Sequence, residues 1–309
     1  MRLKLLINPM CKSAYFSDFL SVAEEELTTI FPGIFLMSST CGGLQFLHVD
    51  CLEKDISKLA RLSFVQGIFE ETKTGLQCVD VSPEYLLPEG VVWGDKYRGK
   101  TNETVTQLGL NLALHFCASK TLSLKLLDPM AGRGTTLFWA ARYGIEAVGI
   151  EQNKDAIEHF HRHIKKQCKI HRIKHKLIQG QLGKKQKNRF GSFREVQWAQ
   201  SKIKLIIGDS AQLSLKPSFN MIVTDLPYGI QFTGSQRRNP IDVLESCASN
   251  WIRMLQAGGA VVLMFNAFQP SREQLRGVFS RLGLEEMSFS GSHRMSESIK
   301  REILILKKP

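Results

Sequence analysis

Hydrophobic and polar positions follow two different patterns along this chain of 309 residues. In the first 90 residues, short apolar runs typical of strands are mixed with amphipathic segments typical of helices. This pattern predicts strands at 3–8, 34–37 and 44–49 and helices at 16–31 and 56–69, which together form a small α+β domain. Prolines and glycines recur between residues 82 and 100, so we expect this domain to span residues 1–90, with its role left open.

From residue 101 onward the two kinds of segment alternate regularly. Helices are predicted at 101–118, 135–143, 154–166, 243–255 and 274–282, and strands at 124–127, 147–150, 204–207, 221–224, 260–265, 286–290 and 302–306. Strands that alternate with helices predict the α/β class, here a doubly wound, mostly parallel, seven-stranded Rossmann-like sheet in a domain spanning 91–309. The last two strands have no helix between them, so we expect an antiparallel hairpin at the edge of the sheet.

Bulk composition narrows the class of protein. With 43% hydrophobic and 23% charged residues, the chain is typical of a globular protein. No apolar run approaches the ~18 residues that a membrane span needs, and the N-terminus shows no secretion signal. Seven scattered cysteines without a C-x-x-C pair support neither a disulfide framework nor a zinc site, so we expect a cytoplasmic protein without metal.

The net charge of +12 is concentrated in one stretch. Residues 162–194 hold 12 basic and no acidic side chains, and the rest of the chain balances at 29 of each sign. Residues 1–90, by contrast, carry 7 basic and 12 acidic side chains, a net charge of −5. We therefore expect a basic insertion at about 162–200 that docks a polyanion.

Two glycines lie between the first strand of the second region and the helix that follows, in the stretch DPMAGRGTT at 128–136. Gly132 and Gly134 would let the backbone approach a ligand closely, although a simple tight turn explains such a pair about as often. The third glycine of a dinucleotide fingerprint is absent, so the site suits a nucleoside without pyrophosphate. Glu151 ends the next strand and is placed to bind ribose hydroxyls. S-adenosylmethionine fits these features, because Asp128 would favour its cationic sulfonium.

Further along, the ends of two later strands carry candidate chemistry. Asp209 could accept a hydrogen bond from an adenine amine, or could simply cap a short helix. Asp225 and the carbonyl of Leu226 could accept both N–H bonds of an exocyclic amine, while Pro227 keeps the turn rigid and offers no competing donor. Tyr228 could stack on the base that carries the amine. This pattern predicts a catalytic site for methyl transfer to the amine of a nucleobase, with Asp225 also bordering the cofactor.

Together these motifs give the chain a family resemblance. Residues 83–309 resemble the THUMP-associated RNA methylases, a class I S-adenosylmethionine-dependent methyltransferase family, in the stretches 96–104, 128–135, 149–151, 208–209 and 225–229. The last stretch has Leu226 where the family usually has proline. The resemblance implies methylation of guanine N2 in tRNA or rRNA, and it places Thr101, Asn102 and Thr104 against the methionine part of the cofactor. Met130 and Thr135 belong to the same cofactor motifs.

The basic stretch supplies the candidate nucleic-acid contacts. We expect one long helix to extend over 159–176, followed by a mobile loop at 180–194, and a second loop at 231–240. The candidate contacts are Lys165, Lys166, Lys169, Lys184, Lys185, Lys187, Arg189, Arg237 and Arg238. RNA is the expected partner, with no membrane, and a small activating subunit or a second copy of the chain is a further possible partner. Two alternatives stay open: methylation of adenine N6 in DNA or RNA, and a catalytically silent nucleic-acid-binding scaffold. A methyltransferase acting on protein glutamine is a further option, which the twelve clustered positive charges fit less well.

Overall fold

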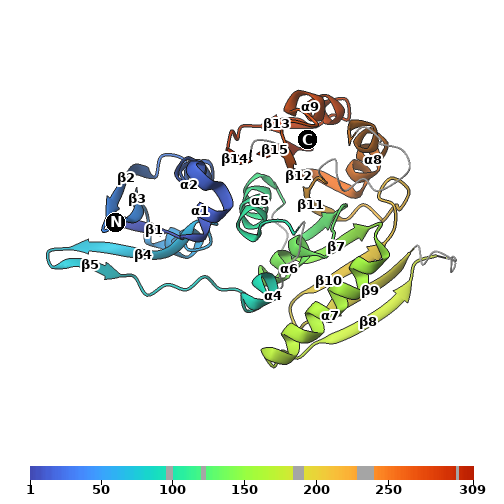
Figure 1. Cartoon of the computed structure of the whole chain (residues 1–309), viewed down its shortest axis with the longest axis horizontal. Helices are drawn as coiled ribbons and strands as arrows, with labels where there is room; N and C mark the ends of the chain where they lie inside the picture. The colour runs from blue at the N-terminus through green and yellow to red at the C-terminus, as the bar shows by residue number, and fades with distance from the viewer. Residues whose placement is uncertain (95–99, 120–122, 184–190, 228–239, 297–298) are drawn as a thin grey trace. The chain divides into compact units, whose positions relative to one another are not determined.

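A computed structural model of the chain describes residues 1–94, 100–119, 123–183, 191–227, 240–296 and 299–309 (Figure 1). The chain forms two compact units. The first unit contains residues 1–84 together with 289–302, and the second contains residues 85–288 together with 303–309. Within the described ranges, no helix is both long enough and apolar enough to cross a membrane.

The first unit is built on an antiparallel sheet with strand order β2-β3-β1-β4-β5. Its strands are β1 (Arg2–Ile7), β2 (Phe35–Cys41), β3 (Leu44–Asp50), β4 (Val65–Thr72) and β5 (Gly75–Cys78), and its helices are α1 (Met10–Tyr15), α2 (Phe19–Ile30) and α3 (Ile56–Leu59). β14 (Ser292–Ser296) pairs with the first residues of β15 (Ile299–Lys307). The ring of His293 on β14 meets the ring of Tyr15 edge-on, with 4.9 Å between centroids. Residues distant in sequence thus share one small core.

The helix predicted at 56–69 is wrong. Only α3 is helical, and the second half of the predicted segment is β4, which pairs with β1. The buried carboxylate of Glu26 on α2 accepts bonds from the backbone N and the Oγ of Ser63, at 3.1 and 2.5 Å. A backbone N–H that bonds a side chain in this way is not available to a helix, so the chain turns here and continues as a strand.

The second unit contains a sheet with strand order β13-β15-β12-β11-β6-β7-β10-β9-β8. Its strands, besides β15, are β6 (Lys125–Asp128), β7 (Glu146–Glu151), β8 (Lys176–Gln181), β9 (Ser192–Gln197), β10 (Lys202–Ile207), β11 (Phe219–Asp225), β12 (Leu255–Asn266) and β13 (Glu285–Met287). Its helices are α4 (Gly90–Trp93), α5 (Glu103–Phe116), α6 (Thr135–Arg142), α7 (Lys154–Ile170), α8 (Pro240–Met254) and α9 (Arg272–Ser280). All seven predicted strands are present, and the predicted antiparallel pairing of the last two is confirmed between β13 and β15.

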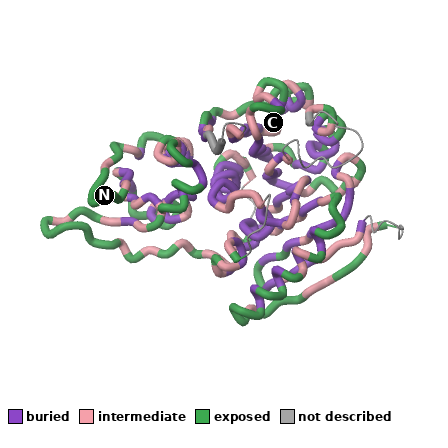
Figure 2. Tube along the Cα trace, in the orientation of Figure 1, coloured by how far each residue is buried: buried purple, intermediate pink, exposed green. Residues whose placement is uncertain are grey.

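Helices cover both faces of this sheet because its central strands are apolar on both sides (Figure 1). On β11 and β12, Ile222 and Leu263 join a core cluster with α8 and α9. Val223 and Met264 point the other way, toward Gly109 of α5. The central strands and α5 are accordingly buried along most of their length (Figure 2). This arrangement confirms the predicted doubly wound α/β fold.

The long helix predicted over 159–176 is wrong, because α7 ends at Ile170. Its last turn closes through bonds from Arg172 N to Lys169 O and from Ile173 N to Cys168 O. The chain then forms β8 and β9, an antiparallel pair that extends the sheet beyond β10. Most of the segment predicted as a loop at 180–194 is therefore strand where it is described, and residues 184–190 lie outside the described residues.

Candidate functional site

Carboxylates lie at or just beyond the ends of four neighbouring strands. Asp225 is the last residue of β11, Asp128 of β6 and Glu151 of β7, and Asp209 follows the end of β10. These strands are adjacent and parallel in the order β11-β6-β7-β10, so their carboxyl ends share one edge of the sheet. The structure thus brings together the four acidic residues that the sequence singled out, and this edge is where ligands bind in open α/β sheets.

Asp128 is the most deeply buried of the four, with 2% of its surface exposed. Its Oδ1 accepts bonds from Thr224 Oγ1 at 2.7 Å and from Met130 N at 3.1 Å. Burial is the main cause that raises the pKa of Asp128 to about 6, bonds from Thr224, Thr136 and Met130 oppose it, and the charge of Asp225 adds to it. A buried carboxylate with a raised pKa is stabilised in its charged form by a nearby cation, so this position favours the binding of a cation.

The loop between β6 and α6 lies against the end of β7. Gly132 and Gly134 have φ angles of 52° and 93°, in the left-handed region that favours glycine. The N–H of Gly132 donates to Glu151 Oε2 at 2.8 Å, and Ala131 N donates to Ile150 O at 3.0 Å. A Cβ at Gly132 would have no atom within 4 Å. The loop therefore presents open backbone surface at the sheet edge.

Gly149 of β7 makes this close approach possible. A Cβ placed on Gly149 would lie 2.6 Å from Cβ of Ala131 and 2.9 Å from a methyl carbon of Leu137. Real Cβ atoms do not come that close, so a side chain here would push the glycine loop away from the strand. Thr135, the first residue of α6, is itself buried.

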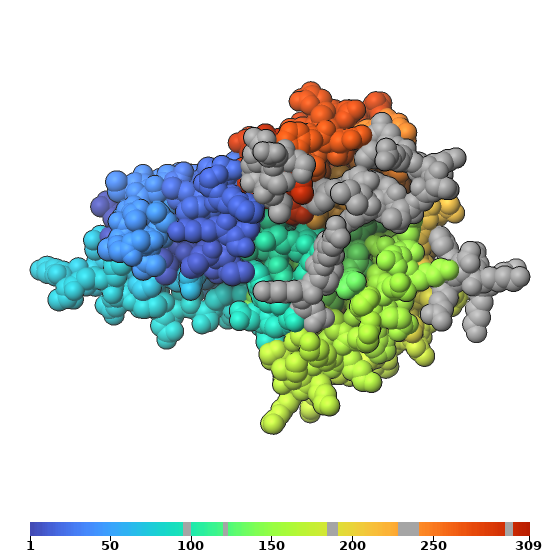
Figure 3. All heavy atoms as spheres, viewed as in Figure 1, coloured from blue at the N-terminus to red at the C-terminus, as the bar shows by residue number. Residues whose placement is uncertain are grey.

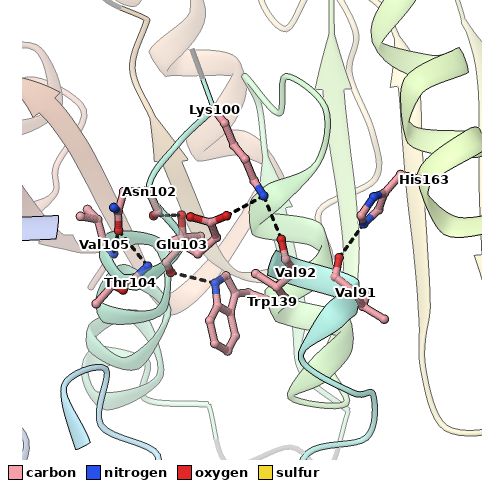
Figure 4. A network of polar contacts seen from close by, with 10 residues as sticks. Val91, Val92, Lys100, Asn102, Glu103, Thr104, Val105, Trp139 and His163 are labelled. Atoms are coloured by element: carbon pink, nitrogen blue, oxygen red, sulfur yellow. Dashed lines mark hydrogen bonds and ion pairs between the residues drawn. The ribbon is translucent and has the colours of Figure 1, made fainter. Parts of the chain in front are cut away.

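A polar network holds the start of α5, where Asn102 is the cap and Thr104 lies in the first turn (Figure 4). Thr101 directly precedes the cap in sequence. Asn102 Oδ1 caps the helix by accepting bonds from the N–H groups of Thr104 and Val105, at 2.9 and 3.2 Å. α5 packs antiparallel to the sheet, since Ala118, two residues after its end, donates its N–H to the carbonyl oxygen of Gly258 before the parallel part of β12. The first turn of α5 therefore lies at the same edge as the four carboxylates.

Lys100 fixes the chain just before this helix. Its Nζ lies 2.6 Å from Glu103 Oε1 and 2.9 Å from the carbonyl oxygen of Val92 on α4. Trp139 Nε1 of α6 donates to the carbonyl oxygen of Glu103 at 2.8 Å (Figure 4). Removing one partner of an ion pair that is so little exposed is costly, because the other charge is left without a partner and poorly solvated. The network thus fixes the segment that, by the family resemblance, is expected to contact the methionine part of the cofactor.

The end of β11 is held from both sides. Leu226 N donates to Met264 O of β12 at 2.8 Å, and the Leu226 side chain is buried in the core. The position of Asp225 and of the Leu226–Pro227 peptide is therefore set by the sheet. Tyr228 lies outside the described residues.

Asp209 caps the turn that follows β10. Its Oδ1 accepts a bond from Ala211 N at 2.9 Å, and its Oδ2 accepts one from Gln212 Nε2 at 3.2 Å. The structure therefore contains the capping interaction predicted for Asp209. The contact between Asp209 and an adenine amine stays a prediction.

The three candidate nucleic-acid residues that the structure describes do not lie at this edge. Lys165, Lys166 and Lys169 lie in the C-terminal half of α7, which begins at the carboxylate edge and runs away from it. The 17 residues of α7 span about 25 Å at 1.5 Å per residue. The remaining candidates, Lys184, Lys185, Lys187, Arg189, Arg237 and Arg238, lie outside the described residues.

Sequence reasoning missed the hydroxyls that hold Asp128. Thr224 is fully buried in β11 and Thr136 is 3% exposed in α6. The signal available in the sequence was a polar residue, Thr224, directly after the apolar run Met221-Ile222-Val223 and before Asp225. A buried hydroxyl needs a partner, and in this protein the partner comes from the neighbouring strand.

Comparison with known proteins identifies one family. Residues 96–276, more than half of the chain, match the family model described as RMKL-like, methyltransferase domain. No curated protein matches the chain. A putative RNA methyltransferase from Pyrococcus horikoshii is similar at 17% identity over 70% of this chain and 88% of that chain, with a TM-score of 0.43. The magnesium protoporphyrin IX methyltransferase from Synechocystis PCC 6803, solved with bound S-adenosylmethionine, is similar at 14% identity over 71% and 88%, with a TM-score of 0.45.

Proposed function

The chain belongs to the RMKL-like family of S-adenosylmethionine-dependent methyltransferases, and we propose that it methylates the exocyclic amine of a nucleobase, guanine N2 in tRNA or rRNA. S-adenosylmethionine is its cofactor and supplies a methyl carbon made electrophilic by a positively charged sulfur. The proposal that the target is an amine rests on one observation: Asp225 ends β11, the strand beside the one that carries Asp128 and the glycine loop, and Leu226 and Pro227 follow it directly. The choice of guanine N2 in RNA follows from the family resemblance.

The residues at the edge fit the cofactor. Gly132 offers backbone with open space where a side chain would otherwise project. Glu151 uses Oε2 to hold the loop and Oε1 to accept a bond from Asn153 N at 2.8 Å, and a carboxylate oxygen has a further lone pair for a ribose hydroxyl. Asp128 favours a cation at the mouth of the sheet. The first turn of α5, with its positive end of the helix dipole, suits the carboxylate of the methionine part.

Asp225 and the Leu226 carbonyl would orient the amine that receives the methyl group. The lone pair of an aromatic amine is delocalised into the ring, so the nitrogen is a weak nucleophile. Two acceptors on its N–H bonds draw the nitrogen toward a tetrahedral geometry and aim its lone pair at the methyl carbon. Positioning of this kind contributes up to ~7–11 kcal/mol in well-oriented reactions. The Asp225 charge would also stabilise the positive charge that grows on the nitrogen as its bond to the methyl carbon forms and the carbon–sulfur bond breaks, and the nitrogen would then lose one of its protons to water.

The direct test supplies labelled S-adenosylmethionine and the protein to tRNA, rRNA and duplex DNA from a host that lacks the gene. Nucleoside mass spectrometry of the labelled product names the polymer and the base. We expect N2-methylguanosine in RNA. Labelled N6-methyladenine would overturn the choice of base, and the absence of label in every nucleic acid would overturn the proposed function.

A matched pair of variants assigns the chemistry to Asp225. Asp225→Ala should lower transfer by at least about a hundredfold, because it removes an oriented acceptor in the reacting complex, while cofactor affinity stays within a few-fold. Asp80→Ala, at an exposed position in the first unit, should leave both unchanged. Loss of cofactor binding in Asp225→Ala would instead assign this residue to the cofactor site.

A further inference from the structure

One end of the second unit carries a strongly basic surface that the proposed chemistry does not use. It consists of the exposed residues Lys165, Lys166 and Lys169 of α7, Arg172 and Lys174 of the following turn, and Lys176 at the start of β8. We call these six residues the distal basic surface. No acidic residue interrupts them in sequence. In the space-filling view, α7 and the β8 strand form the lower, yellow-green part of the visible surface (Figure 3).

Five of the six residues of the distal basic surface differ from two lysines on β10 in having no ion pair among the described residues. Lys202 and Lys204 on β10 pair with Glu146 and Glu195, at 3.1 and 2.5 Å. Of the distal residues, Lys165, Lys169, Arg172, Lys174 and Lys176 have no carboxylate within ion-pair distance among the residues that the structure describes. Uncompensated charges of one sign repel each other and oppose folding, so their presence favours a role in binding an anion.

Arg172 gives a second, independent indication. It follows the end of α7 with a φ of 52°, in the left-handed region that glycine or asparagine adopts more readily. A bulky, charged residue at this position is a conformational cost to the fold. An outlier of this kind points to a use for the side chain itself. The Arg172 side chain is exposed beside Lys169 and Lys174, where it adds to the positive surface.

The position of this surface defines the kind of partner. Lys165 lies 12 residues along α7 from its cap Asn153, about 18 Å at 1.5 Å per residue, and the rest of the surface lies further from the carboxylate edge. Successive phosphates of one strand are about 3.4 Å apart along a duplex, so this distance corresponds to roughly five or more nucleotides. A free nucleoside or a very short oligonucleotide at the catalytic edge does not reach the distal basic surface.

We propose that the distal basic surface binds the phosphate backbone of a folded RNA at a site about 18 Å or more from the base being methylated, so that the substrate class is a structured RNA. This inference rests on the proposed function for the identity of the reaction. A membrane is a poorer fit, because the one large apolar side chain exposed between these residues, Ile170, is too small an area for interfacial insertion.

The first test measures binding of unfractionated tRNA to the full chain, without cofactor, over a range of salt concentrations. Lys165→Gln/Lys169→Gln/Lys174→Gln should weaken binding by at least about tenfold at low salt and reduce the salt slope by about 2 to 3, at ~0.7–0.9 for each lost phosphate contact. The matched control neutralises three exposed lysines elsewhere: Lys54, Lys73 and Lys216. Equal losses in the two triple variants, or an unchanged slope in the first, would overturn the proposal.

The second test separates binding from folding. Arg172→Asn places a residue that tolerates the left-handed conformation, so its melting temperature should equal or exceed that of the unchanged protein while tRNA binding weakens. Binding of the same variant to anionic lipid vesicles is measured alongside. Unchanged tRNA binding would contradict an RNA-binding surface, and so would a loss confined to vesicle binding.

The third test uses whichever RNA is methylated. In the triple variant at 165, 169 and 174, KM for the folded RNA should rise, while kcat and the KM for a fragment of about five nucleotides around the target should not change. A rise in both KM values would contradict the distance argument. If no RNA is methylated, the proposed function fails, and the tRNA binding result still decides whether this surface binds RNA.

Discussion

Replacing Asp128 by asparagine should stabilise the fold and weaken the cofactor site at the same time. The carboxylate of Asp128 is buried at the end of β6, and this burial is the main cause that raises its pKa from 3.8 to about 6. Asparagine has nearly the same shape, and its Oδ1 can still accept the bonds from Thr224 and Met130. The substitution therefore removes a buried charge and retains the hydrogen bonds at Oδ1.

The size of the effect follows from the pKa shift. A carboxyl whose pKa is raised on folding binds its proton more tightly in the folded than in the unfolded chain. Its contribution to stability is therefore fully present below about pH 4 and is lost as the pH rises through about 6. A shift of about two pH units corresponds to roughly 3 kcal/mol at 1.36 kcal/mol per unit. Asp128→Asn should gain this amount above pH 6.

Urea denaturation of the unliganded protein between pH 4 and 8 measures this difference. We expect the unfolding free energies of the unchanged protein and of Asp128→Asn to agree near pH 4. Above pH 6, the free energy of Asp128→Asn should be higher by up to roughly 3 kcal/mol. Asp80→Asn, an exposed position, controls for the substitution itself. Calorimetric titration at pH 8 should show at least about tenfold weaker binding of S-adenosylmethionine. A stability difference that is the same at every pH would refute the assignment of a buried charge, and unchanged affinity would remove Asp128 from the cofactor site.

Three further predictions follow from the geometry. Glu151→Ala should weaken cofactor binding by about tenfold or more in calorimetry, because it removes both a ribose acceptor and an anchor of the loop, and unchanged affinity would exclude Glu151 from the site. Lys100→Met should lower the free energy of unfolding by about 3 kcal/mol in urea denaturation, since it leaves the Glu103 charge unpaired and poorly solvated. The double variant Lys100→Met/Glu103→Gln should recover part of this loss, and no recovery would contradict a pairwise effect. Gly149→Ala should cost about 1–3 kcal/mol because its Cβ would meet Ala131, and a stability equal to that of the unchanged protein would show that the loop can move away freely.

Much of the second unit could be predicted from the sequence because the relevant signals are local. Apolar runs such as 221–223 identify strands that are buried on both faces, and the helices between them imply a parallel sheet. Parallel strands align their carboxyl ends, so residues that end successive strands were expected at one edge. Asp128, Glu151 and Asp225 indeed lie there. The hydroxyl of Thr224 was missed because its partner belongs to another strand.

What the sequence by itself determined is thus the order of strands and helices along the second unit and the set of acidic residues at the carboxyl edge of its sheet, since both follow from periodicity and chain direction. Tertiary structure alone decided which distant segments meet. Glu26 bonds Ser63 and so replaces a predicted helix by β4, residues 289–302 join the first unit, and β8 and β9 extend the sheet. It also decided that Lys165, Lys166 and Lys169 of α7 lie far from the carboxylates, because a helix that starts at one edge of a sheet carries its last turns toward the opposite edge.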